Sequence, residues 1–167
     1  IFSGEKIAVW SDYDCDGIPG AVLMHDFLQK AGANFENYIP HRHDEGYGMN
    51  VEGIEKLASA GDGVKLIITV DSGITDIEPV ARANKFGIDV IITDHHLPSG
   101  KLPGAFAILN PNARENETYP FKGLCGSGVA CKLVCAVLAI APELREKVPE
   151  GWEKWLLDMV GLATIAD

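Results

Sequence analysis

Acidic and histidine side chains gather in three short motifs whose residue types suit a divalent metal ion. The motifs are Asp12-Tyr13-Asp14-Cys15-Asp16, Asp71-Ser72-Gly73 and Asp94-His95-His96. Carboxylates packed together repel one another unless a cation neutralises them. Carboxylate oxygens with imidazole and without thiolate favour Mn²⁺ or Mg²⁺, and a nitrogen ligand favours Mn²⁺. Two such ions about 3.5 to 4 Å apart form the clamp used for phosphoester hydrolysis. One carboxylate usually bridges them, and Asp71 is the natural candidate.

Each motif taken alone could also have a purely structural role. In an extended loop the alternating Asp12, Asp14 and Asp16 would point the same way, but a solvated acidic turn or a helix cap uses the same residues. Asp71 and the two residues after it also fit a turn that leads into a helix cap. The Asp94 motif, with two adjacent imidazoles, is harder to explain as structure alone. The missing downstream Glu excludes a calcium-binding EF-hand loop.

The chain that carries these motifs alternates between strand-like and helix-like segments. Apolar periodicity predicts strands over 6–10, 35–39, 66–70, 89–93 and 105–109, and helices over 17–31, 51–60, 76–86, 129–140, 143–147 and 152–165. Two continuous Val/Ile-rich runs separated by a helix indicate a parallel sheet covered on both faces. We therefore expect an α/β fold: a Rossmann-like, mostly parallel five-stranded sheet flanked by helices, with a helical C-terminal segment. The carboxyl ends of its strands would bring the three motifs to one edge.

Composition limits what kind of protein this is. Hydrophobic residues make up 47% of the 167 residues, enough for one compact domain. The formal net charge of −10 argues against a simple nucleic-acid-binding surface, but it allows an enzyme that reaches phosphate through metal ions. No apolar run approaches the roughly 18 residues of a membrane span and no signal-peptide pattern is present, so no membrane partner is expected.

Two further features concern the cell compartment and the extent of the chain. The four cysteines form no C-x-x-C pair, and they predict reduced thiols in a cytoplasmic protein. The chain starts at Ile1 and stops at Asp167 within an apolar pattern. We therefore expect a piece of a longer protein.

Taken together, the motifs resemble those of the DHH phosphoesterases. Asp14-Cys15-Asp16, Asp71-Ser72-Gly73 and Asp94-His95-His96 are similar to the first three motifs of that superfamily, and residues 161–167 resemble the fourth. Residues 12–17, 39–48 and 124–132 resemble the RecJ-like branch of single-strand-specific exonucleases. The resemblance covers nearly the whole chain in the family's order. It implies that 1–167 is the DHH catalytic domain, and that the C-terminal DHH-associated domain lies outside this sequence.

The resemblance also implies a set of metal ligands. Asp14 and Asp16 would each bind one ion, and Asp71 would bridge the two. His95 and Asp167 would complete one of the two sites. The implied ions are Mn²⁺ or Mg²⁺.

Three more residues follow from the same comparison of motifs. His96 would lie beside the scissile phosphate, so His96 and Asp71 are the candidate catalytic residues. Asp12 occupies an acidic position typical of the RecJ-like branch. The pyrophosphatase branch has a metal-binding His where this chain has Trp10, and an indole cannot replace it. Asp12 or water would have to complete that site, and Trp10 counts against a pyrophosphatase.

Two segments are candidates for contact with substrate. Residues 41–48 contain Arg42 and Tyr47, which could bind a phosphate and stack on a base, although a surface loop with a structural Tyr would look the same. Ser127 and Gly128 lie in a Gly-Ser-Gly segment before a predicted helix, where free N–H groups could hold a phosphate or simply cap the helix. Two tryptophans at helical spacing, Trp152 and Trp155, are expected to pack rather than to stack on bases.

The resemblance implies a function and leaves two alternatives open. It implies metal-dependent hydrolysis of single-stranded DNA from the 5′ end in DNA repair and recombination, with single-strand-binding protein or another repair factor as a protein partner. A phosphodiesterase acting on short oligoribonucleotides or cyclic dinucleotides is the enzymatic alternative. A scaffold member of the superfamily that has lost its metal ligands is the non-enzymatic one, and the presence of all four motifs argues against it.

Overall fold

A single parallel sheet forms the centre of the molecule. The computed structural model describes residues 1–60, 63–114 and 118–167. The five strands stand in the order β2-β1-β3-β4-β5, and every neighbouring pair is parallel. Their bounds are β1 Ile7–Ser11, β2 Phe35–Tyr38, β3 Leu66–Val70, β4 Asp89–Thr93 and β5 Ala107–Leu109. The expected five-stranded α/β fold is confirmed.

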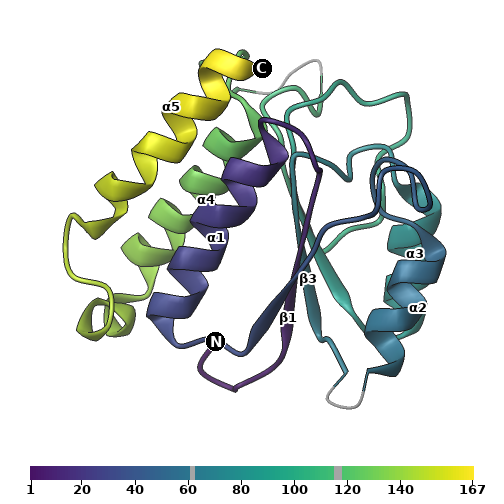
Figure 1. Ribbon diagram of the computed structural model, residues 1–167, viewed down its shortest axis with the longest axis horizontal. Coiled ribbons are helices and arrows are strands. Elements are labelled where there is room, and N and C mark those ends of the chain that lie inside the picture. The colour runs from purple at the N-terminus through teal and green to yellow at the C-terminus, as the bar shows by residue number, and fades with distance from the viewer. Residues whose placement is uncertain (61–62, 115–117) are drawn as a thin grey trace.

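Helices cover both faces of this sheet (Figure 1). α1 (Gly17–Ala31), α4 (Gly126–Ile140) and α5 (Leu157–Ala166) pack against one another on one side, and α2 (Val51–Ser59) and α3 (Ile77–Lys85) pack together on the other. Two short 3₁₀ helices, η1 (Pro142–Glu146) and η2 (Trp152–Leu156), connect α4 to α5. All described helices fall short of what would be required to cross a membrane, in length or in apolar character.

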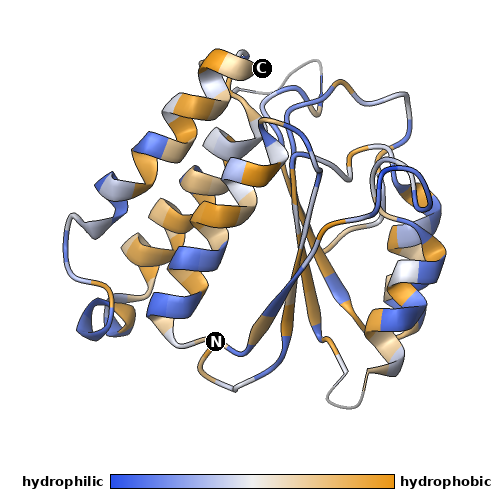
Figure 2. Ribbon diagram, in the orientation of Figure 1, coloured by the Kyte–Doolittle hydropathy of each residue, from blue (hydrophilic) through white to orange (hydrophobic). Residues whose placement is uncertain are grey.

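The side chains of β1 alternate between two apolar cores, which explains why helices cover both faces of the sheet. Ile7 and Val9 belong to the apolar core beneath α1 and α4, whereas Ala8 and Trp10 belong to the core beneath α2 and α3. Side chains of a strand alternate between the two faces of its sheet, so a strand buried on both sides reads as a continuous apolar run. Figure 2 shows this as hydrophobic colour along the central strands.

The predicted bounds match the structure for some elements and differ by one to three residues for others. The predictions for β3, β4 and α1 match the structure, and α1 ends where Gly32 adopts a left-handed conformation with φ +72°. β1 extends to Ser11, and β5 begins two residues later than predicted. α4 begins at Gly126 instead of residue 129. The predicted helix over 152–165 divides into η2 and α5.

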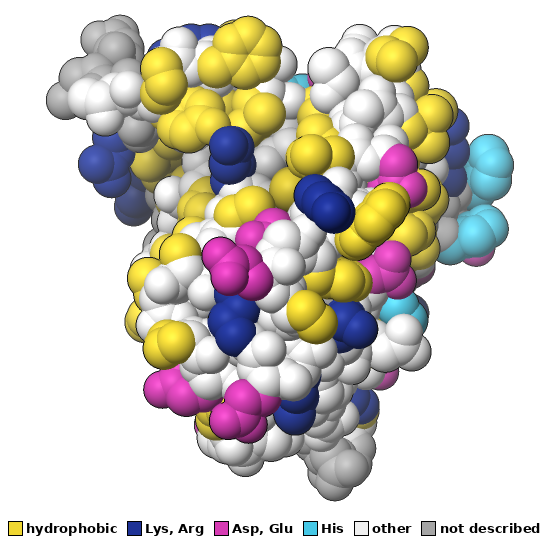
Figure 3. Space-filling model, turned by 90° about the vertical axis from the view of Figure 1, so that its left-hand side faces the viewer, with side chains coloured by type: hydrophobic (Ala, Val, Ile, Leu, Met, Phe, Trp, Pro, Cys, Tyr) yellow, Lys and Arg dark blue, Asp and Glu magenta, His cyan; other side chains and the backbone are white. Residues whose placement is uncertain are grey.

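The packing prediction for the two tryptophans is half right. Trp152 packs against the core beneath α1 and α4, but Trp155 is 69% exposed, so the prediction for Trp155 is wrong. α5 is apolar and also exposes Leu157, Leu162 and Ile165. Figure 3 shows the face on that side of the molecule, where hydrophobic side chains lie among charged ones.

Candidate metal centre

The three predicted motifs do meet at the carboxyl edge of the sheet. Asp12 follows β1, Asp71 follows β3, and Asp94 follows β4. The backbone N–H groups of these three residues donate to Val70, Thr93 and Leu109 of the neighbouring strands, at 3.1, 2.9 and 3.1 Å. The sheet's own hydrogen bonds therefore extend into the motifs and fix where each side chain starts.

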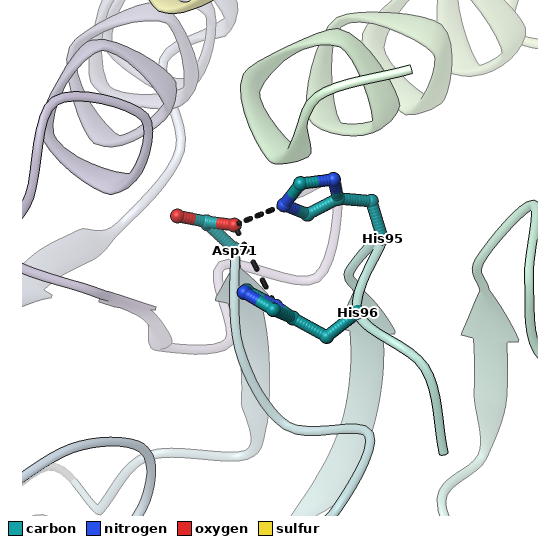
Figure 4. Close-up of side chains that lie close together, drawn as sticks. All are labelled: Asp71, His95 and His96. Atoms are coloured by element: carbon teal, nitrogen blue, oxygen red, sulfur yellow. Dashed lines mark ion pairs between the residues drawn. The ribbon is translucent and has the colours of Figure 1, made fainter. Parts of the chain in front are cut away.

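The candidate ligands form three overlapping groups, in each of which the ligand atoms lie within 4.8 Å of one another. Asp71 and His95 each belong to two of the groups. Figure 4 shows the first group, with both imidazoles turned toward the Asp71 carboxylate. The groups are Asp71 with His95 and His96, Asp16 with His95 and Asp167, and Asp12 with Asp14 and Asp71.

Unpaired buried atoms indicate that these groups suit a cation. Oδ1 of Asp12, Oδ1 of Asp71 and Nε2 of His95 are buried without a hydrogen-bond partner. His95 Nε2 stands 3.2 Å from Asp71 Oδ1 and 3.7 Å from Oδ2 of Asp16. Leaving such atoms unpaired in the interior is costly. A divalent ion would use the oxygens and the nitrogen together, so the residues present fit Mn²⁺ or Mg²⁺.

Asp71 occupies an unusual backbone conformation at the centre of the groups. Its φ of +60° lies in the left-handed region, which Asp tolerates better than most residues. Burial, followed by the charges of Asp16 and Asp14, raises the pKa of Asp71 to about 7. The start of α4 lies so close that a side chain on Gly126 would place its Cβ 2.5 Å from Asp71 Oδ1.

The N-terminus of α4 holds the carboxylate of Asp16. The backbone N–H groups of Gly126 and Ser127 both donate to this carboxylate, the latter at 2.7 Å, and Ser127 Oγ donates to the Asp16 carbonyl at 2.6 Å. Negative charge is favourable at a helix N-terminus. The expectation of free N–H groups at Gly126 and Ser127 is therefore corrected: they bind Asp16. Ser127 and Gly128 are buried.

The first motif is a turn and not an extended segment. Asp14 Oδ1 accepts hydrogen bonds from the N–H groups of Asp16 and Gly17, both at 2.9 Å. This turn directs Asp14 into one group of ligands with Asp12, and Asp16 into another. The structure therefore has the turn that was the alternative to an extended loop, in which the Asp14 carboxylate binds nearby backbone N–H groups, and Asp14 and Asp16 do not point the same way.

Asp94 supports the histidines and lies outside all three ligand groups. It is buried and accepts hydrogen bonds from the backbone N–H groups of His95 and His96 and from His96 Nδ1, the last at 2.7 Å. The bond to Asp94 raises the pKa of His96 to about 9. The His96 ring therefore carries a positive charge at neutral pH.

Tyr47 of the predicted substrate segment reaches the metal centre directly. Its hydroxyl lies 3.3 Å from both the Asp71 carbonyl and His96 Nδ1, and the residue is 49% exposed. Arg42 connects to the centre through Tyr13, whose ring lies 5.1 Å from its guanidinium carbon.

Trp10, at the position where the pyrophosphatase branch has a metal-binding His, packs into the core and not into the metal centre. Trp10 is fully buried in the core beneath α2 and α3, and its ring stacks on Tyr38. Sequence reasoning missed Tyr13, although it stands between two predicted ligands. It also missed Glu45, which lies within the substrate segment and binds the His41 N–H, and Asp76, which binds the N–H of Met49 directly after that segment. No spacing rule links those residues to the site.

Comparison with known proteins agrees with this geometry. The chain is 42% identical to the single-stranded-DNA-specific exonuclease RecJ of Bacillus subtilis over 98% of its length, and 38% identical to the Escherichia coli protein of that name. It spans 19% and 29% of those two proteins. A solved structure of an exonuclease RecJ bound to manganese superposes with a TM-score of 0.82 at 32% identity, covering 100% of this chain and 40% of that one. The family described as "DHH family, N-terminal domain" matches residues 6–164. The chain therefore belongs to the DHH family.

Proposed function

We propose that residues 1–167 form the catalytic domain of a RecJ-like exonuclease, which hydrolyses single-stranded DNA from the 5′ end with two Mn²⁺ or Mg²⁺ ions. The observation that carries the proposal is a pair of ligand groups at one sheet edge, Asp12-Asp14-Asp71 and Asp16-His95-Asp167, which meet where His95 Nε2 stands 3.2 Å from Asp71 Oδ1. Two adjoining groups of this kind suit two adjacent ions. Both named relatives described above are single-stranded-DNA-specific exonucleases.

The proposed ligands are Asp12, Asp14, Asp16, Asp71, His95 and Asp167. Ions held by these side chains would supply a hydroxide near neutral pH and polarise the phosphate. His96 is the proposed catalytic cation, because its protonated ring stands beside Asp71 and Asp94 keeps it charged. Asp94 is thus a positioning residue and not a ligand.

Arg42 and Tyr47 are the proposed substrate-binding residues. The guanidinium of Arg42 can pair with two oxygens of one phosphate. The half-exposed ring of Tyr47 offers a face for a base beside the metal centre. Ser127 donates through its N–H and its hydroxyl to Asp16, so its proposed role is to hold this ligand in place, where a phosphate contact was expected of Ser127 and Gly128.

The cellular setting is part of the proposal. We propose a role in DNA repair and recombination, in which single-strand-binding protein or another repair factor presents the strand. The four free cysteines support work in the reducing cytoplasm.

Labelled oligonucleotides test the activity. The chain is incubated with Mn²⁺ and a long single strand, its duplex, or a dinucleotide, each labelled at the 5′ end. We expect immediate release of a labelled mononucleotide from the single strand only. Asp14→Asn should abolish this release because it removes a metal ligand. Asp26→Asn, on the exposed side of α1, makes the same chemical change and should leave the rate unaltered.

Other outcomes would replace this proposal with one of the alternatives. Hydrolysis of the dinucleotide but not of the long strand would indicate a phosphodiesterase of short substrates. Absence of Mn²⁺ binding in calorimetry, together with absence of hydrolysis, would indicate a scaffold protein. Equal activity of Asp14→Asn and the unsubstituted chain would contradict the ligand assignment.

A further inference from the structure

The segment that carries both proposed substrate residues is a loop of residues 41–49. It connects β2 to α2, and residues 42–45 form a turn within it. Arg42 lies near its start and Tyr47 near its end. Both side chains are largely exposed. Contacts of other residues in the loop therefore contribute to where they stand.

The end of the loop is held from two sides. Trp10 Nε1 donates to the Gly48 carbonyl at 3.2 Å, and Asp76 Oδ2 accepts from the Met49 N–H at 2.7 Å. Gly48 and Met49 are buried. These bonds fix the residue that follows Tyr47, and the Tyr47 hydroxyl makes its own contact with the Asp71 carbonyl. Tyr47 is therefore positioned without help from the start of the loop.

The start of the loop is held by Glu45. Its carboxylate accepts a hydrogen bond from the His41 N–H at 2.8 Å and another from the Tyr38 hydroxyl, and Lys56 Nζ lies 3.4 Å away. The Glu45 side chain is only 16% exposed. Tyr38 is itself packed against the core, because its ring stacks on the buried ring of Trp10 with the centroids 4.1 Å apart.

These bonds enclose the position of Arg42. The Glu45 carboxylate binds the N–H of His41, the residue before Arg42, and this bond closes the turn. Its second bond, to the Tyr38 hydroxyl, connects the turn to the core. The Arg42 guanidinium carbon lies 5.1 Å from the centre of the Tyr13 ring, and its positive charge also acts on the Asp12 carboxylate. We propose that Glu45 is a positioning residue for substrate binding, which holds Arg42 over the first acidic motif so that its guanidinium is ready for a phosphate. This inference rests on the proposed function.

A cationic side chain that is already held in its binding position binds a phosphate more tightly than one that must be ordered on binding. Removal of the Glu45 carboxylate should therefore raise KM for a single-stranded oligonucleotide about tenfold, and kcat should change much less because Tyr47, His96 and the metal ligands keep their contacts. Tenfold corresponds to about 1.4 kcal/mol. A residue needed only for folding would instead lower the amount of active enzyme and reduce kcat.

The test compares Glu45→Ala and Glu45→Gln with Asp44→Ala. Gln keeps one acceptor oxygen, so it should recover part of the lost affinity. Asp44 is the neighbouring acid, 78% exposed and paired with the exposed His41 ring. Its removal makes the same charge change in the same turn and should leave KM unaltered. In an Arg42→Ala background Glu45→Ala should have little further effect, because Glu45 acts through Arg42.

Amide hydrogen exchange provides a readout independent of hydrolysis. In Glu45→Ala, the N–H of residue 41 should exchange faster, and the N–H of Met49, held by Asp76, should exchange as before. Unchanged exchange at residue 41, or an unchanged KM, would overturn the inference while the activity of the unsubstituted chain upheld the proposed function. An unsubstituted chain that neither binds nor hydrolyses the oligonucleotide would overturn both.

Discussion

Replacement of Asp71 by Asn should stabilise the metal-free protein while it removes the response to metal. Asp71 is 1% exposed and sits among other acids. Asn has nearly the same shape and also accepts the left-handed backbone of φ +60° that this position requires. The substitution therefore removes the charge with little change in backbone strain, which Asp71→Ala would not achieve.

The expected gain in stability on replacing Asp71 follows from the pKa of this residue. Burial and the neighbouring acids raise this pKa from 3.8 to about 7. The folded protein thus binds this proton more tightly than the unfolded chain, so stability falls as the pH rises from about 4 to 7. About three pKa units at 1.36 kcal/mol each give a cost of about 4 kcal/mol above pH 7.

The contact with His95 is already contained in this value. His95 Nε2 stands 3.2 Å from Asp71 Oδ1 and lowers the pKa of Asp71, against the larger effect of burial. The stabilisation by Asp71→Asn at about pH 8 should therefore reach about 4 kcal/mol. For a chain of this length that corresponds to a rise in Tm of about 8 to 16 °C.

Thermal unfolding measured by circular dichroism tests both halves of the prediction. In EDTA at about pH 8, Asp71→Asn should melt above the unsubstituted protein, and the difference should shrink at about pH 4 because Asp71 is then protonated. With excess Mn²⁺ only the unsubstituted protein should gain stability. Asp26→Asn serves as the surface control. A lower Tm of Asp71→Asn in EDTA, or an equal gain with Mn²⁺, would refute the reasoning.

Two further substitutions test the parts that surround Asp71. Gly126→Ala should lower the free energy of unfolding by about 1 to 3 kcal/mol, because its Cβ would lie 2.5 Å from Asp71 Oδ1 and 2.8 Å from Asp71 Cα. It should also weaken Mn²⁺ binding in calorimetry, and an unchanged affinity would show that α4 can move away from Asp71 without disturbing the site. Asp94→Asn should return the pKa of His96 from about 9 toward its usual 6.5, which an NMR titration of the ring in the metal-free protein measures, and a value still near 9 would mean that Asp94 is not the cause.

The sheet could be predicted from the sequence because its information is local. β3 and β4 are continuous runs of apolar, β-branched residues, and their predicted bounds match the structure. The parallel arrangement then places residues that follow different strands at one edge. The approach of Asp12, Asp71 and His95 to one another required no more than that rule.

The support of the site could not be predicted, because it depends on contacts between distant segments. Asp16 and Ser127 are 111 residues apart, and the Gly-Ser-Gly pattern that holds Asp16 looks the same as one that binds phosphate. Glu45 reads as a surface acid until Tyr38 and the His41 N–H are placed beside it. In both cases the residue type was informative, but the partner that decides its role was supplied by the fold.

Different partners also explain how the acids of one cluster can have separate roles. Asp14 and Asp16 differ by two positions, yet a turn and the N-terminus of α4 direct them into different ligand groups. Asp94 has the same carboxylate and is committed to N–H groups and to His96. Both oxygens of Asp94 accept hydrogen bonds from N–H groups, whereas one buried oxygen each of Asp12 and Asp71 is unpaired and remains available to a cation. Asp16 combines the two situations, because both its oxygens accept N–H bonds from the start of α4 and Oδ2 still lies 3.7 Å from His95 Nε2. Hydrogen bonding therefore fixes where each acid of this cluster stands, and the proposed ligands are the acids whose oxygens also face another member of a ligand group.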